Sequence, residues 1–129
     1  MKIRGLLIDV KADPGMVNDI WLDEDIIENF YDVLQCDLID IVKRPIGGIE
    51  YNIVCDDEGL FDAHPYVSAV DEHDNPMLVG NLFICNDDGE GRLTSLTEDD
   101  IQHIGQYIHI HVHWVNDSRL HVAPELLIC

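Results

Sequence analysis

Residues Met77–Ile104, MLVGNLFICNDDGEGRLTSLTEDDIQHI, carry the clearest local pattern in the chain. An apolar run of strand length, Met77–Cys85, leads into a turn rich in Asp and Gly and then into a helix start. Thr97 and Asp100 have the spacing of a capping box, with Asp in place of the usual Glu or Gln. The acids of this first turn complement the helix dipole. The stretch therefore predicts a strand, a turn and a helix over about residues 97–107.

The remaining elements are predicted from periodicity and turn residues. Strands are expected at Lys2–Val10, Met16–Leu22, Leu38–Val42, Ile49–Cys55 and Ile108–Val115, with a last edge strand at Leu120–Cys129 interrupted at Pro124. A helix is expected at Asp23–Gln35, a connection at Lys43–Gly48 and a loop at Leu60–Pro76. Together, these elements predict an α+β fold in one domain, residues 1–129. Its antiparallel or mixed sheet of five to seven strands would have both helices packed on one face.

The composition limits the classes of partner. The chain has 129 residues and 47% hydrophobic content, enough for a single core. With 26 acidic residues against 7 basic ones, its formal net charge is -19. Such a charge repels nucleic acid and acidic membranes. A basic protein is therefore the expected macromolecular partner.

The cysteines and the N-terminus indicate a compartment. Cys36, Cys55, Cys85 and Cys129 form no Cys-x-x-Cys pair. The opening residues lack the apolar core of a signal peptide, and no apolar stretch has the length of a membrane span. We expect reduced thiols and a cytoplasmic protein.

The order of elements resembles the DUF3846 family, small domains of unknown function found in phages, plasmids and bacteria. The resemblance covers about residues 1–105 and leaves 108–129 outside. It rests on Leu6–Asp9, Cys36–Ile39, Asp56–Leu60, Gly80–Asn81 and Leu93–Ile101. The family has no assigned activity, so the resemblance implies no catalytic residue. It implies a mobile-element context, hence the cytoplasm of a host cell.

Three histidines alternate with apolar residues near the C-terminus: His109, His111 and His113. On a strand, neighbours at i and i+2 point the same way about 6.6–6.8 Å apart, from which two imidazoles can share a zinc ion. The first and third would be about 13 Å apart on a straight strand. A further ligand would then come from His103, His121 or a carboxylate. The alternative is an amphipathic strand with a histidine-rich polar face.

No catalytic motif is present. The chain has no Gly-x-Ser-x-Gly, no phosphate-binding glycine loop and no cysteine in a basic setting. The sequence therefore favours a non-enzymatic function.

The acids suggest mimicry of nucleic acid. Glu24, Glu28 and Asp32 recur every four residues on the expected helix, about 6 Å apart. Asp57 and Asp88 lie in two acidic turns. Because duplex DNA is a dense line of negative charge, such rows can occupy a basic DNA-binding groove.

Three functions follow from these patterns. The first is a phage- or plasmid-type interaction protein that blocks a basic host factor, such as a nucleic-acid-processing defence protein. The second is a small metal-binding protein or metal-dependent enzyme built on His109, His111 and His113. The third is a housekeeping domain of a salt-adapted organism, in which the acids serve solubility.

Overall fold

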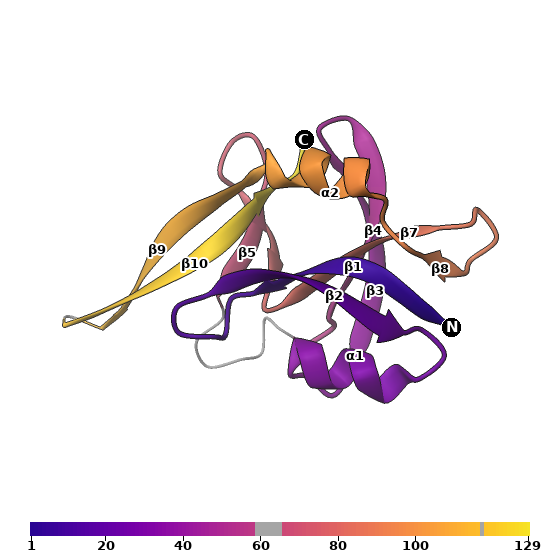
Figure 1. Ribbon diagram of the computed structural model, residues 1–129. Helices are drawn as coiled ribbons and strands as arrows, with labels where there is room; N and C mark the ends of the chain where they lie inside the picture. The colour runs from indigo at the N-terminus through magenta and orange to yellow at the C-terminus, as the bar shows by residue number, and fades with distance from the viewer. Residues whose placement is uncertain (59–65, 117) are drawn as a thin grey trace.

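The computed structural model describes residues 1–58, 66–116 and 118–129 (Figure 1). Gly59–Pro65 of the expected loop lie outside the described residues. The elements are β1 (Lys2–Asp9), β2 (Met16–Asp23), α1 (Ile27–Leu34), β3 (Ile39–Ile46), β4 (Ile49–Asp56), β5 (Val67–Val70), β6 (Pro76–Val79), β7 (Leu82–Asp87), β8 (Leu93–Thr94), α2 (Glu98–Gly105), β9 (Ile108–Asn116) and β10 (Arg119–Leu127).

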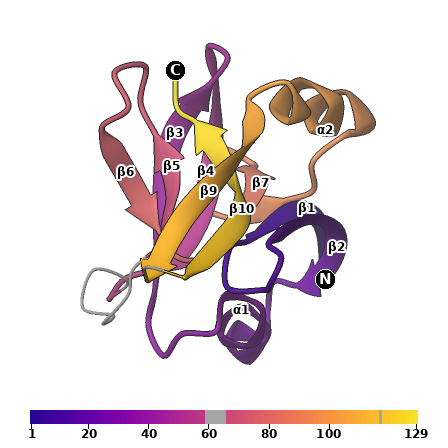
Figure 2. The same ribbon diagram turned by 90° about the vertical axis from the view of Figure 1, so that its left-hand side faces the viewer.

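The strands form two sheets. The six-stranded sheet has the order β2-β1-β7-β4-β3, with β8 paired to β7, and the four-stranded sheet has the order β6-β5-β10-β9. The predicted α+β fold is wrong, because the structure is mainly β, with 54% of the described residues in strands and 13% in helices. The two helices do not share a face: α1 and α2 lie on opposite sides of the six-stranded sheet (Figures 1 and 2).

The two helices lie on opposite sides because the six-stranded sheet carries apolar side chains on both faces. On β1, Leu6 and Ile8 belong to the core shared with α2 and the second sheet, whereas Ile3 and Leu7 belong to the core under α1. β7 and β4 divide their side chains in the same way. The apolar side chains of a face are removed from water only when another element covers that face. Burial of apolar surface is the main favourable term in folding. One face is closed by α1, the other by α2 and the four-stranded sheet.

The expected strand Met77–Cys85 is divided at Gly80 and Asn81. Gly80 has φ +76°, a conformation that side chains other than glycine rarely adopt, and its N–H donates to the Tyr66 carbonyl. The residues before the break form β6 in one sheet, and those after it form β7 in the other. The single apolar run therefore links the two sheets.

Helix α1 begins later than expected. Asp23 is the last residue of β2 and pairs with Lys2. The helix runs from Ile27 to Leu34 rather than from Asp23 to Gln35, and Gln35 closes it in the left-handed region at φ +53°.

Three further features of the strands differ from the sequence prediction. β3 continues to Ile46, so the expected connection is reduced to the turn Gly47–Gly48. The expected loop contains β5 and the start of β6. β10 is an interior strand and β9 is the edge. Pro124 is tolerated in β10 because pairing with β5 starts only at Leu126.

Two local predictions are confirmed. β1 and β2 form an antiparallel hairpin over their whole length. Thr97 caps α2 in both directions: its Oγ1 accepts the N–H of Asp100 at 3.1 Å, and its own N–H donates to the Asp100 carboxylate at 2.9 Å. No helix in the described ranges is long and apolar enough to cross a membrane.

We expect Asn81→Ala to reduce the free energy of unfolding by about 2–4 kcal/mol. The fully buried Asn81 side chain accepts the N–H groups of Val10 and Lys11 and donates to the Val33 carbonyl, so it joins the end of β1 to α1. Alanine leaves these buried groups without partners. Urea unfolding monitored by circular dichroism measures the loss, and a change below about 0.5 kcal/mol would contradict this role.

Candidate functional site

The predicted histidines lie on one face of the β9–β10 hairpin. The register places His109 opposite Glu125, His111 opposite Ala123 and His113 opposite His121. Directly opposite residues of antiparallel strands point to the same face. This face, which we call the histidine face, therefore combines His109, His111, His113, His121 and Glu125.

The histidine face has two halves, and Glu125 is the central residue of the half that contains His109 and His111. Its side chain lies among buried atoms, with the residue only 4% exposed. One carboxylate oxygen is 3.1 Å from His109 Nε2, and the other is 3.8 Å from His111 Nδ1. Because a buried carboxylate needs partners, the hydrogen bond from His109 compensates part of its loss of hydration, while His111 lies beyond hydrogen-bond distance.

His113 and His121 form the second half with Tyr66. The buried His121 donates through Nε2 to the Val10 carbonyl at 2.6 Å, and Tyr66 stacks on its ring at 4.6 Å between centroids. Tyr66 also meets His113 edge-on. Burial, followed by the neighbouring His111, lowers the pKa of His113. His113 Nε2 is buried and has no hydrogen-bond partner among the described residues.

A cavity of about 490 Å³ adjoins the histidine face. It is lined by His109, His111, His113 and Glu125, and by Val67, Val70, Asp74 and Pro76 from the β5–β6 region. As the side chains stand, no three His, Cys, Asp or Glu residues of the described ranges are placed to hold a metal ion. His109 and His111 turn to Glu125, whereas His113 turns to Tyr66.

The predicted acidic residues are distributed over separate places. Glu24 precedes α1, its side chain is only 8% exposed, and it pairs with Arg92 Nε. Glu28 and Asp32 lie exposed on α1 and form no salt bridge with the described residues. Asp88 is in the β7–β8 turn, where its Oδ1 accepts the N–H groups of Glu90 and Arg92. The expected row of three acids along one helix is thus reduced to two.

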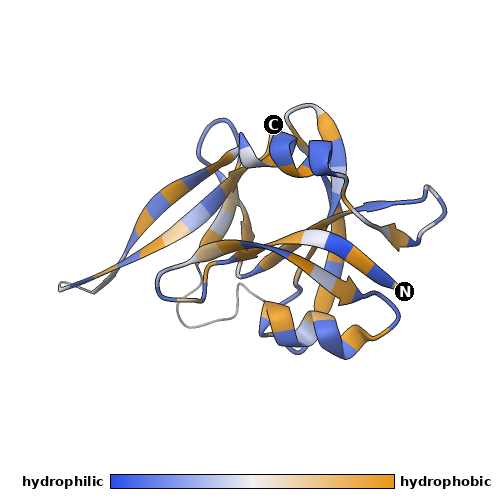
Figure 3. Cartoon of the chain, in the orientation of Figure 1, coloured by the Kyte–Doolittle hydropathy of each residue, from blue (hydrophilic) through white to orange (hydrophobic). Residues whose placement is uncertain are grey.

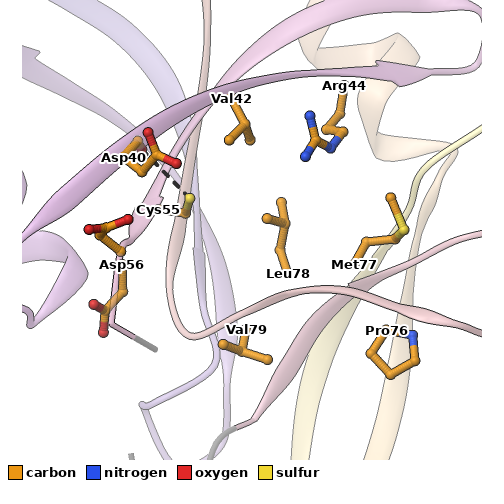
Figure 4. A pocket seen from close by; sticks show the side chains of 10 residues that line it. Asp40, Val42, Arg44, Cys55, Asp56, Pro76, Met77, Leu78 and Val79 are labelled. Carbon is orange, nitrogen blue, oxygen red and sulfur yellow. Dashed lines mark hydrogen bonds between the residues drawn. The ribbon is translucent and has the colours of Figure 1, made fainter. Parts of the chain in front are cut away.

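Asp57 lines a pocket of about 250 Å³ between β3–β4 and β6 (Figure 4). Asp40 and Asp56 also line this pocket and lie near Cys55, and Arg44 lies at the other end. Val42, Leu78 and Val79 supply the apolar wall. Arg44 Nε is buried without a described partner, while its Nη1 donates to the Lys43 carbonyl.

The two buried thiols, Cys55 and Cys85, are poor nucleophiles. Burial is the main cause that raises the pKa of Cys55 to about 11 and that of Cys85 to about 12, and nearby carboxylates add to it. Both therefore stay protonated at neutral pH, and a thiol is a far weaker nucleophile than a thiolate. All four cysteines are unpaired.

Sequence reasoning missed Glu125, Tyr66 and Arg44. The alternation of β10 across Pro124 would have placed Glu125 on the same face as His121. Its register against His109, however, depends on the length of the hairpin turn, which no motif specifies. Arg44 was placed in a connection, because Pro45 and two glycines follow it.

Fold and site define a class: a small, mainly β domain with an acidic exterior and a histidine–carboxylate cluster on one hairpin. The sequence matches a domain of unknown function, DUF3846, over residues 3–109, so the chain belongs to this family. No curated protein and no solved structure matches the chain. The family match ends within β9, although β10 contributes Ala123 and Leu126 to the core, and Ile128 directly after it also belongs to the core.

We expect Glu24→Lys to lower the melting temperature by several degrees and Glu28→Lys to leave it unchanged or higher. Glu24 is enclosed and bound to Arg92, so reversal places two cations together. Glu28 is exposed and stands four residues from Asp32, and removing a like-charge pair favours a helix. Thermal unfolding by circular dichroism compares the two variants. Equal effects would show that the Arg92 pair does not hold this end of α1.

Proposed function

We propose that the protein is an acidic, non-enzymatic binding protein that occupies a basic, nucleic-acid-binding surface of another protein in the cytoplasm. The observation that carries this proposal is the distribution of its cations. Arg4, Lys43, Arg92 and Arg119 each form a salt bridge with an acid of the same chain. These four cations are therefore already paired within the chain, and with 26 acids against 7 basic residues most exposed carboxylates have no cation to pair with.

Six exposed or half-exposed acids without a salt bridge among the described residues lie on or near α1 and the ends of β3 and β4. We call this set the α1–β4 acidic surface, consisting of Glu28, Asp32, Asp37, Asp40, Asp56 and Asp57. The Asp57 N–H donates to the Leu38 carbonyl at 3.0 Å, and both Asp56 and Asp37 raise the pKa of the Cys36 thiol, after burial. Lys11 lies at the same helix end and donates through Nζ to the carbonyls of Leu34 and Gln35, so its charge offsets part of the negative potential there without forming a salt bridge.

The pocket beside Asp57 suits a basic side chain. Its apolar wall can contact the aliphatic stem of Lys or Arg, whose charged end would lie near Asp40, Asp56 and Asp57. A basic DNA-binding groove presents such side chains in rows spaced for phosphates. The match of charge supports binding to that groove and would speed association.

Reversal of Glu28 and Asp32 to Lys should abolish binding to the basic partner. The immobilised wild type is used to capture proteins from bacterial lysate, and bound protein is displaced with a short DNA duplex. The matched control is Glu72→Lys with Glu90→Lys, which changes the net charge equally at exposed acids outside the α1–β4 acidic surface. Captured protein should be displaced by DNA and by rising salt. Equal capture by the reversed variant, or capture that DNA does not displace, would reject the proposal.

Salt dependence of stability separates mimicry from salt adaptation. Between about 10 mM and about 150 mM salt the Debye length falls from roughly 30 Å to 8 Å, so self-repulsion is screened. The melting temperature should rise over this range and then level off. Stability that keeps rising into molar salt, with unfolding in its absence, would favour a protein adapted to high salt.

A weak zinc site is the second candidate function. Two neighbouring histidines of β9 need a further ligand to bind zinc, and Glu125 provides a carboxylate. His109 and His111 already contact it, and rotation of these half-exposed rings would bring three ligands toward the cavity. Zinc should then raise the melting temperature by mass action, and Glu125→Gln or His111→Ala should remove the effect. His73→Ala, an exposed histidine in the β5–β6 turn, is the control. Indifference of the wild type to zinc would dismiss this candidate.

A further inference from the structure

The side of the β9–β10 hairpin opposite the histidine face is apolar and exposed. We call it the apolar hairpin face: Ile110, Val112 and Trp114 of β9 with Leu120 and Val122 of β10. Trp114 is 72% exposed and Ile110 66%. Trp114 lies opposite Leu120, and Val112 opposite Val122, so the side chains form one continuous patch. Patches of this kind usually mark an interaction site.

The hairpin is placed so that another molecule can reach it. β9 is the edge strand of its sheet, and the hairpin projects away from the rest of the chain (Figures 1 and 2). Apolar residues alternate with polar ones along both strands (Figure 3). The histidine face takes the side toward the cavity, and the apolar side chains are left facing outward.

The charge distribution selects the occupant of this surface. Among 26 acidic residues, only Asp117 lies between Gln106 and Pro124. A basic partner would gain little from a surface without acids. Two copies of a chain with a net charge of -19 repel each other wherever their acids meet. The apolar hairpin face is the surface on which such copies can touch without placing acid against acid.

We propose that the apolar hairpin face packs against the same face of a second copy of this chain. Such contact is isologous, since one patch is complementary to itself across a twofold axis. Two sheet faces pack about 10 Å apart, which encloses the side chains of both. The five side chains cover roughly 500 Å² per copy, from the area that aromatic and aliphatic groups bury. This is less than the roughly 800 Å² per partner of a standard interface, so the dimer is a weak one.

Sedimentation velocity of the purified protein over roughly 10–500 µM tests this proposal. The mass should rise from the 14.7 kDa of one chain toward twice that value. Val112→Glu should weaken the dimer at least about tenfold, because it places a charge at the contact. The matched control is Val17→Glu, which adds the same charge to an exposed valine on β2, an edge strand of the other sheet. It should dimerise like the wild type, apart from the small effect of one added charge.

Fluorescence gives a second measurement that does not depend on a charge. Trp21→Phe leaves Trp114 as the only tryptophan, and Trp21 is an exposed residue of β2. Emission should shift to the blue with concentration as Trp114 loses water. Dimerisation should also strengthen as salt screens the repulsion, whereas binding of a basic partner should weaken.

A wild type that stays monomeric over the whole concentration range would overturn the proposal. So would a Val112→Glu variant that dimerises like Val17→Glu, or Trp114 emission that does not respond to concentration. The experiment uses the pure chain without a partner, so its failure leaves the α1–β4 acidic surface untouched. Loss of partner capture by the Glu28 and Asp32 reversal would likewise not bear on the dimer.

Discussion

The six-stranded sheet carries apolar side chains on both faces, and the rest of the structure covers those faces. α1 places Phe30 edge-to-face against Phe83, with ring centroids 5.8 Å apart, and so closes one side. The other side is too wide for α2 alone, and the four-stranded sheet completes it with Ala69, Ala123 and Leu126. The chain passes between the sheets at Gly80 and Asn81. The buried Asn81 amide satisfies backbone groups there, which an apolar side chain would leave unpaired.

The ion pairs show how a chain with few cations folds despite its large net negative charge. Arg4 is bound to both Asp19 and Glu98, and so connects β2 to the start of α2. Arg92 joins Glu24 and Asp25 before α1 to the end of the β7–β8 turn. These pairs connect segments far apart in sequence, at places where acids would otherwise meet. The α1–β4 acidic surface, in contrast, has no salt bridge with the described residues.

Local chemistry was predictable from the sequence, and long-range partners were not. The Thr97–Asp100 capping box depends on residues three apart, so both of its hydrogen bonds follow from the sequence. The helix start at Ile27 was missed, because Asp23 pairs with Lys2 as the last residue of β2, and this partner is distant in the sequence. The break at Gly80 was missed because an apolar run of nine residues has no periodicity that separates one strand from two. The histidine face was predicted as a set, but its carboxylate partner depends on hairpin register.

Two surfaces with opposite physical requirements therefore belong to one small chain. The α1–β4 acidic surface keeps its charge in water, because carboxylates without partners are costly to bury. The apolar hairpin face gains from burial, and its strands contain almost no acid. If the acids were spread evenly over the chain, both surfaces would bind less well. Charges on the hairpin would oppose close packing, and apolar side chains around α1 would weaken its negative electrostatic potential. Segregation would allow both proposed contacts at once, since a copy docked on the hairpin would leave α1 exposed. A pair of chains would then present two acidic surfaces, and simultaneous engagement of two basic sites raises avidity without any new contact within either site.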